Sequence, residues 1–221
     1  LKHAGLAVDS SVEIIWINSE RLTSENVKKQ LSEVDGILVP GGFGGRGIEG
    51  MIVAAKYARE NNVPYFGICL GMQIASIEFA RNVCLLENAN SSEWDSNTPY
   101  PLIHIMPHHS GKDSMGGTLR LGNWPCELQP NTKAETLYQN TLINERHRHR
   151  YEFNNEYREV FIKNNMIFSG LSPDKTLVEI IEPKVAKMAS ILTEKSIKYS
   201  KIPAVGRTHG QHASIISFGL K

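Results

Sequence analysis

The sequence predicts an α/β fold, an open and mainly parallel sheet flanked by helices, because the chain contains two successive strand–loop–helix units. In the first unit, an apolar run at 35–40 ends in Gly41 and Gly42, and an amphipathic helical pattern follows at 48–61. In the second unit, an apolar run at 63–68 leads through Cys69 into helical spacing at 70–83. Strands and helices that alternate in this way form parallel sheets with helices on both faces.

The remaining elements are predicted from β-branched alternation and from helical spacing of apolar residues. They are strands at 12–17, 102–105, 118–121, 151–153, 167–169 and 177–181, and helices at 23–31 and 155–164. A glycine-free stretch at 183–199 predicts a further helix, and a loop is expected at 203–213. We therefore expect a domain over residues 1–182, followed by a helical tail and loop over 183–221.

The composition is that of an ordinary globular protein, with 41% hydrophobic and 21% charged residues. The net charge of +1 provides no attraction to nucleic acid or membrane surfaces, and no apolar run approaches the roughly 20 residues that span a bilayer. Three cysteines without metal-ligand spacing predict no metal site and a reducing, cytoplasmic location. Because Leu1 stands inside what reads as a helix end, we expect a fragment of a longer protein.

Cys69 is the candidate nucleophile. Gly67 and Gly71 flank it between a predicted strand and a predicted helix, the arrangement of a nucleophile elbow. The positive end of the helix dipole favours the thiolate. An isolated Gly-x-Cys-x-Gly is more often a buried cysteine in a turn, so the assignment depends on the flanking sequence.

Five runs supply that flanking sequence. They are PGGFG at 40–44, GICLGMQ at 67–73, ENANSSE at 87–93, GGTLRLG at 116–122 and ERHRHRYE at 145–152. In this order they resemble the class I glutamine amidotransferase domain of the CTP synthase family, over residues 1–182. The last two runs carry the resemblance to CTP synthase in particular.

The resemblance implies that the Cys69 thiolate attacks the side-chain amide of L-glutamine, forming a γ-glutamyl thioester and ammonia. It assigns glutamine binding to five residues: Gly42, Leu70, Gln73, Glu93 and Arg150. The backbone N–H groups of Gly42 and Leu70 would form the oxyanion hole. The carboxylate of Glu93 would hold the α-ammonium group of glutamine, and the guanidinium of Arg150 would hold its α-carboxylate.

Each of these features also has a structural interpretation. The Gly41-Gly42 pair could be an ordinary turn, and Glu93 could be a solvated surface carboxylate. The alternating arginines and histidines at 146–150 could form one charged face of an exposed strand. They could also bind phosphate or nucleic acid, but the low net charge and the absence of interleaved aromatic residues oppose this.

The family completes its catalytic triad with a Tyr/Phe-His-Pro-Glu-Phe motif, and no His-Pro-Glu occurs in this sequence. We therefore expect an incomplete fold and impaired hydrolysis, since the loss of general acid–base catalysis costs about 10²–10⁴-fold. The alternative is a degenerate, non-catalytic glutaminase fold that binds glutamine or a partner.

The tail has its own resemblance. GRTHGQHA at 206–213 and FGLK at 218–221 resemble adenylosuccinate lyase of the fumarase/aspartase superfamily. This implies that Thr208 and His209 lie at a lyase substrate, in active sites that several chains assemble together. A lyase-related function is a minor alternative. A join near Glu182 could be a gene fusion, a frameshift or recombination product, or an assembly error, and we expect such a tail to pack poorly on the preceding domain.

CTP synthase ancestry also implies partners. An upstream ATP-dependent amidoligase domain would use the ammonia to aminate UTP, and the full-length protein would be a homo-oligomer. ATP and Mg²⁺ would belong to that domain, so no cofactor is expected in this segment.

Overall fold

The computed structural model of the chain describes residues 1–105, 120–184 and 214–220. These residues form two compact units, one comprising Leu1–Phe79 together with the final strand and the other comprising Ala80–Lys184. The helices are α1 Lys2–Ala7, α2 Val27–Leu31, α3 Ile48–Asn61, α4 Leu70–Asn82, α5 Lys133–Tyr138 and α6 Arg158–Lys163, with 3-10 turns η1 Ser19–Arg21 and η2 Asn155–Tyr157.

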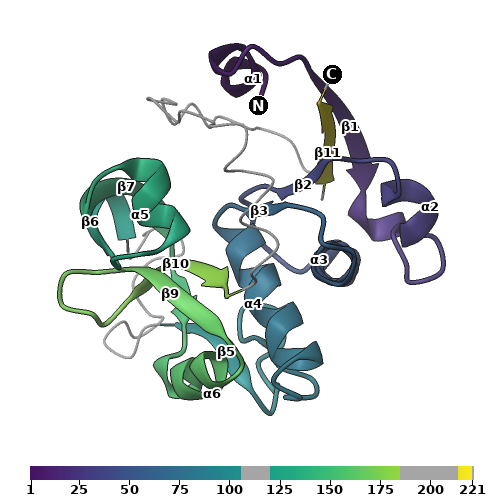
Figure 1. The fold of residues 1–221 in the computed structure, drawn as a ribbon. Helices are drawn as coiled ribbons and strands as arrows, with labels where there is room; N and C mark the ends of the chain where they lie inside the picture. Colours follow the sequence, from purple (N-terminus) through teal and green to yellow (C-terminus); the bar gives the residue numbers. More distant parts are fainter. Residues whose placement is uncertain (106–119, 185–213, 221) are drawn as a thin grey trace. The chain divides into compact units, whose positions relative to one another are not determined.

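The first unit contains a four-stranded sheet (Figure 1). Its strands lie in the order β1 Val12–Asn18, β11 Ser214–Leu220, β2 Gly36–Val39 and β3 Tyr65–Gly67. β2 and β3 pair in parallel, whereas β11 is antiparallel to both of its neighbours. The predicted α/β fold is confirmed, but the sheet is mixed rather than mainly parallel because of β11.

Helix α3 shows how the sequence defines an element of this unit. It begins after Gly47 and ends before Asn62, and both of these residues have the left-handed backbone that commonly stops a helix. A Cβ atom added at Gly50 would lie 1.8 Å from the carbonyl oxygen of Ser19, so only glycine permits this packing of α3 against η1. The predicted helix at 48–61 is confirmed to the residue.

The second unit contains two sheets. One has the strand order β10 Val178–Pro183, β9 Met166–Leu171, β6 Arg120–Leu128 and β7 Leu142–His149, and the other β4 Asn90–Ser91, β5 Pro101–Ile105 and β8 Tyr151–Phe153. Phe153 packs edge-on against Phe161 of α6 and Phe168 of β9, with ring centroids 5.1 and 5.3 Å apart. These three aromatic rings join α6 to both sheets.

The tail differs in part from its prediction. Pro183 ends strand β10 instead of starting a helix, and the rest of the predicted helix at 183–199 lies outside the described residues. The loop at 203–213 lies outside them as well. Residues 214–220 pair with both β1 and β2, so the expectation of poor packing is wrong for this part of the tail.

Candidate functional site

The turn at Cys69 has the geometry of a nucleophile elbow. β3 ends at Gly67, α4 begins at Leu70, and Cys69 between them has a φ of 53°. A left-handed backbone at a non-glycine residue is strained, and such strain is concentrated at functional sites. The N–H of Gly71 donates to the carbonyl of Ile68 at 3.0 Å, which closes the turn.

Glycine is required on both sides of this turn because backbone segments approach closely there. A Cβ atom at Gly67 would lie 2.4 Å from the carbonyl carbon of Gly71. A Cβ atom at Gly71 would lie 2.2 Å from the carbonyl oxygen of Val39 in β2. The two glycines therefore allow α4 to start directly against the sheet, with the cysteine at the tip of the turn.

The loop after β2 lies beside the elbow. β2 and β3 are parallel neighbours, so their carboxyl ends meet at one edge of the sheet, where α/β folds bind ligands. A Cβ atom at Gly41 would lie 3.6 Å from the Cβ of Cys69, and one at Gly42 would lie 3.0 Å from a methyl group of Leu70. The structure thus brings together the predicted nucleophile and the two residues predicted to donate to the oxyanion.

Helix α4 is fixed behind the nucleophile by polar contacts. The hydroxyl of Tyr65 donates to the carbonyl of Gly71 at 2.8 Å, and burial raises the pKa of Tyr65, so the hydroxyl stays a donor. Arg59 of α3 donates to both carboxylate oxygens of Glu78, whose side chain is 3% exposed. The side chain of Gln73, one turn into α4, is buried. These contacts hold α4 to β3 and to α3.

The two other glutamine-binding candidates belong to the second unit. Glu93 follows β4 and is half-buried, and its N–H donates to the hydroxyl of Ser91 at 3.2 Å. Arg150 is exposed and separates β7 from β8. Their roles at glutamine stay predictions. Thr208 and His209 lie outside the described residues.

The three thiols have different surroundings. Burial raises the pKa of Cys84 to about 11 and that of Cys126 to about 12. Cys69 is half-buried and is the only one of the three that precedes a helix directly. Thiolate chemistry at neutral pH is therefore disfavoured at Cys84 and Cys126.

Comparison with protein families decides the class to which the elbow belongs. A family model described as Glutamine amidotransferase class-I matches residues 1–191, which is most of the chain. The chain belongs to the class I glutamine amidotransferases. A second model, described as Lyase, matches residues 171–221. The predicted join near Glu182 lies where these two matches overlap.

The glutaminase relatives are CTP synthases. Those of Bacillus velezensis and Staphylococcus saprophyticus are each 59% identical to this chain, over 184 and 182 residues. The matches cover 83% and 82% of this chain and 34% of each relative, so the chain spans about a third of their length. A solved structure, the Trypanosoma brucei CTPS glutaminase domain with bound acivicin, matches with a TM-score of 0.77 and 36% identity. That match covers 82% of this chain and 71% of the other.

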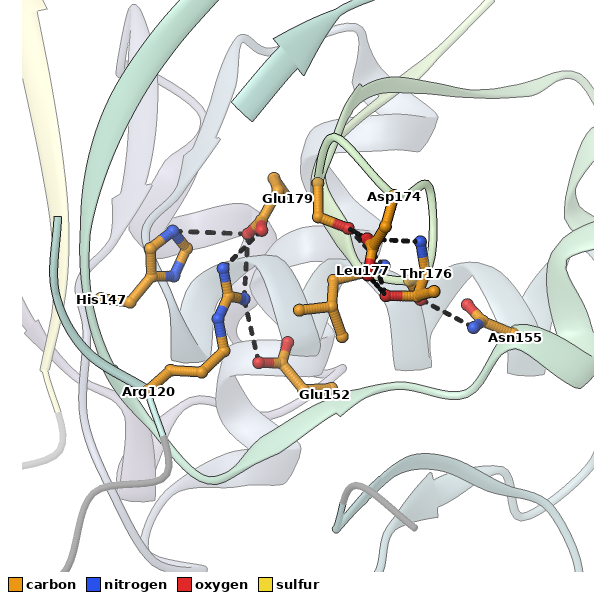
Figure 2. Close-up of polar contacts among 9 residues, drawn as sticks. Arg120, His147, Glu152, Asn155, Asp174, Thr176, Leu177 and Glu179 are labelled. Carbon is orange, nitrogen blue, oxygen red and sulfur yellow. Dashed lines mark hydrogen bonds and ion pairs between the residues drawn. The ribbon is translucent and has the colours of Figure 1, made fainter. Parts of the chain in front are cut away.

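The second unit contains a buried charge cluster, drawn in Figure 2. Arg120 at the start of β6 is 1% exposed, and it donates to Glu152 of β8 at 3.0 Å and to Glu179 of β10 at 2.5 Å. His147 of β7 lies 3.4 Å from Glu179. Burial alone would lower the pKa of Arg120, but its pairing with the two carboxylates raises it overall. The cluster joins strands of both sheets.

A second polar group in Figure 2 holds the turn between β9 and β10. The Asp174 carboxylate accepts from the hydroxyls of Ser172 and Thr176, and the Ser172 bond is the leading cause of the lowered pKa of Asp174. The amide of Asn155 donates to the carbonyl of Thr176 at 2.7 Å. This network stabilises the turn that leads into β10, the strand that carries Glu179.

Sequence reasoning assigned no role to Arg120. The side chains of the arginine-rich run at 146–150 have two distinct environments. Arg146 and Arg148 are exposed on β7, as the exposed-strand interpretation predicts, while His147 between them is half-buried. The available signal for Arg120 was its place between Leu119 and Leu121, where a charged residue interrupts apolar ones.

Two general findings complete the description. Across residues 1–105, 120–184 and 214–220, no group of three or more His, Cys, Asp or Glu side chains is placed to hold a metal ion. The helices found in the same ranges are all too short or too polar to cross a membrane.

Proposed function

We propose that this chain carries the thioester-forming part of a CTP-synthase-type glutaminase. The thiolate of Cys69 attacks the side-chain amide carbon of L-glutamine, and the C–N bond breaks to release ammonia. The observation that carries the proposal is the elbow itself, with Cys69 in a left-handed backbone and Gly41 beside it.

The negative charge that develops on the amide oxygen of glutamine must be stabilised in this reaction. The N–H of Leu70 is the first of α4, and the first N–H groups of a helix have no intrahelical acceptor. The Leu70 N–H and the N–H of Gly42 are therefore suited to receive the oxyanion, and loss of one such donor costs about 10²–10³-fold in kcat. Glu93 and Arg150 complete the proposal as partners of the α-ammonium and α-carboxylate groups.

Both steps of the proposed reaction are slow. The leaving ammonia needs a proton and the attacking water needs a base, which the family takes from its His-Pro-Glu motif. No such motif occurs in this sequence, so we expect turnover to be about 10²–10⁴-fold below that of an intact glutaminase.

A glutamine-mimicking chloroketone tests the proposal, because it alkylates an activated thiol that lies in a glutamine site. We expect labelling of Cys69 that saturates with reagent concentration and that excess L-glutamine suppresses. The Cys69→Ser variant should take no label, and Cys126→Ser should label like the parent chain. Labelling that L-glutamine leaves unchanged would contradict the assignment of a glutamine site.

A second candidate function is a degenerate glutaminase fold that binds glutamine without reacting, and the missing His-Pro-Glu favours it. In that case calorimetry would detect glutamine binding, while the chloroketone would label Cys69 no faster than it labels a small thiol. Lyase chemistry from Thr208 and His209 has less support, since the family match there covers residues 171–221 alone.

The partners follow from the relatives and are part of the proposal. The ammonia would pass to an ATP-dependent amidoligase domain that aminates UTP, within a cytoplasmic homo-oligomer. Adding a separately purified amidoligase domain from a related CTP synthase, with ATP, Mg²⁺, UTP and glutamine, would test for glutamine-dependent CTP formation.

A further inference from the structure

The place of β11 in the first sheet is unusual for the topology around it. β1 and β2 are consecutive in the first unit and are joined through α2, but they do not pair with each other. β11 lies between them and pairs with both, as Figure 1 shows. The strand that fills the interior of this sheet therefore comes from the lyase-like tail.

A doubly wound sheet of the flavodoxin type has the strand order 2-1-3-4-5, with its strands parallel. β1, β2 and β3 match the strands numbered 2, 3 and 4 in that order, since β2 and β3 are parallel neighbours and one position separates β1 from β2. The separating position is that of the strand numbered 1, which is parallel to its neighbours in this fold. β11 occupies the position in the antiparallel direction.

We propose that the position between β1 and β2 is an acceptor site for a β-strand, and that β11 occupies it in the antiparallel direction. The inference is independent of the proposed glutamine chemistry. The ligand of this site is an extended, largely apolar segment, here SIISFGL at 214–220.

β11 pairs with the strand on each of its sides, β1 and β2. On one side the register with β1 is unbroken over seven pairs, from Val12 opposite Leu220 to Asn18 opposite Ser214. On the other side, Ile216, Ser217 and Phe218 lie opposite residues of β2. All four residues of β2 are buried, so its backbone N–H and C=O groups on that edge need partners within the protein.

Main-chain hydrogen bonds explain how a segment from the tail can occupy the position between β1 and β2. Strand addition derives its affinity from backbone groups, which every non-proline residue carries. Antiparallel and parallel neighbours both satisfy these groups, with different bond patterns. A segment can therefore fill this position through its backbone, with few demands on its side chains.

Hydrogen exchange in the full chain gives the first test. We expect the amides of 216–218 to be protected to the same order as those of β2, because these residues are paired on both sides. Exchange of 214–220 at the rate of an unstructured peptide, with β2 still protected, would overturn the proposal.

Two matched proline variants give the second test. Ser217 pairs with Ile15 and with Ile37, whereas Ser214 pairs with Asn18 alone at the first position of the strand. Proline is tolerated at the first residue of a strand but not in its interior. Ser217→Pro should reduce protection of β2 at least tenfold, and Ser214→Pro should leave it unchanged.

The final test treats the position as a binding site. A fluorescein-labelled peptide SIISFGLK should bind the Ser217→Pro chain saturably, and it should not bind the parent chain, whose site is occupied. The same peptide with proline at the position of Ser217 should not bind. Equal peptide binding to both chains would refute the acceptor site, and if the variant fails to fold, exchange in the parent chain decides.

Discussion

The close contact at Gly71 yields a quantitative prediction for the elbow. In Gly71→Ala the new Cβ atom would lie 2.2 Å from the carbonyl oxygen of Val39. An ordinary C···O contact is about 3.3 Å or more, so the start of α4 must move away from β2 by roughly 1 Å. Overpacking of this kind costs about 1–3 kcal/mol, and a displacement of 1 Å at reacting atoms can cost about 10²-fold in rate.

The matched control is Gly41→Ala on the neighbouring loop. Its Cβ atom would lie 3.6 Å from the Cβ of Cys69, an ordinary van der Waals contact, and neither Gly41 nor Gly71 has a positive φ. We expect Gly41→Ala to change the free energy of unfolding by less than about 1 kcal/mol. The higher helix propensity of alanine stabilises Gly71→Ala by as much as about 1 kcal/mol. A net loss of stability in this variant would therefore have to come from the close contact with Val39.

Two assays separate the effects of these variants. Urea unfolding measures the free energy, and the rate of chloroketone alkylation measures the alignment of Cys69. Gly71→Ala should be less stable and about 10²-fold slower to alkylate, whereas Gly41→Ala should resemble the parent chain in stability. If the two variants behave alike, the close approach of α4 to β2 does not position the nucleophile.

Three further predictions concern Arg120, Tyr65 and Cys84. Arg120→Ala leaves two buried carboxylates unpaired and should cost about 3–5 kcal/mol in urea unfolding, whereas Arg146→Ala, at an exposed position of the adjacent strand, should change stability by less than about 0.5 kcal/mol. Tyr65→Phe removes the donor to the first turn of α4, so we expect a loss of about 1–3 kcal/mol and slower chloroketone labelling; unchanged values would show that this bond does not hold the helix. Because burial raises the pKa of Cys84 to about 11, its thiol stays protonated as the pH rises from 7 to 9. Iodoacetamide followed by peptide mapping should therefore modify Cys69 throughout this range and Cys84 only above about pH 10; preference for Cys84 at pH 7 would refute the assignment of the reactive thiol.

Local sequence rules predicted the parts of the first unit that local chemistry determines. The bounds of α3 follow from residues with left-handed backbone at each end, and the elbow follows from glycines that the backbone contacts require. The strand at 63–68 is present but shorter, as β3. In each case the information lies within a few residues of the feature itself.

Some elements of the second unit carried a signal that was not used. Helix α5 has Thr132 at its N-cap, whose hydroxyl accepts from the N–H of Glu135, in the spacing of a capping box. Strand β6 contains Gly122 and Pro125, residue types that normally argue against a strand interior. Gly122 has a φ of 100°, which glycine permits, and Pro125 pairs with β7 alone. These local exceptions explain why β6 was predicted only in part.

The buried cluster around Arg120 and the place of β11 depend on long-range pairing. Nothing near Arg120 in the sequence indicates that two carboxylates from β8 and β10 will reach it. The segment at 214–220 has a strand-like composition, but its neighbours are strands far earlier in the chain, at Val12–Asn18 and Gly36–Val39. The sequence pattern therefore indicates that a strand is possible there, but not between which two strands it lies.

The geometry of the elbow does not depend on a general base. A strained φ at Cys69 persists only where the surrounding structure over-determines it. The contacts that do so here are the close approaches at Gly67 and Gly71, the bond from Tyr65 and the β2–β3 pairing, and all of them lie within Leu1–Phe79. None of them involves a histidine. The nucleophile can therefore keep its geometry whether or not a general base follows in the chain, so thiol labelling reports on the elbow, and only steady-state ammonia release reports on the base.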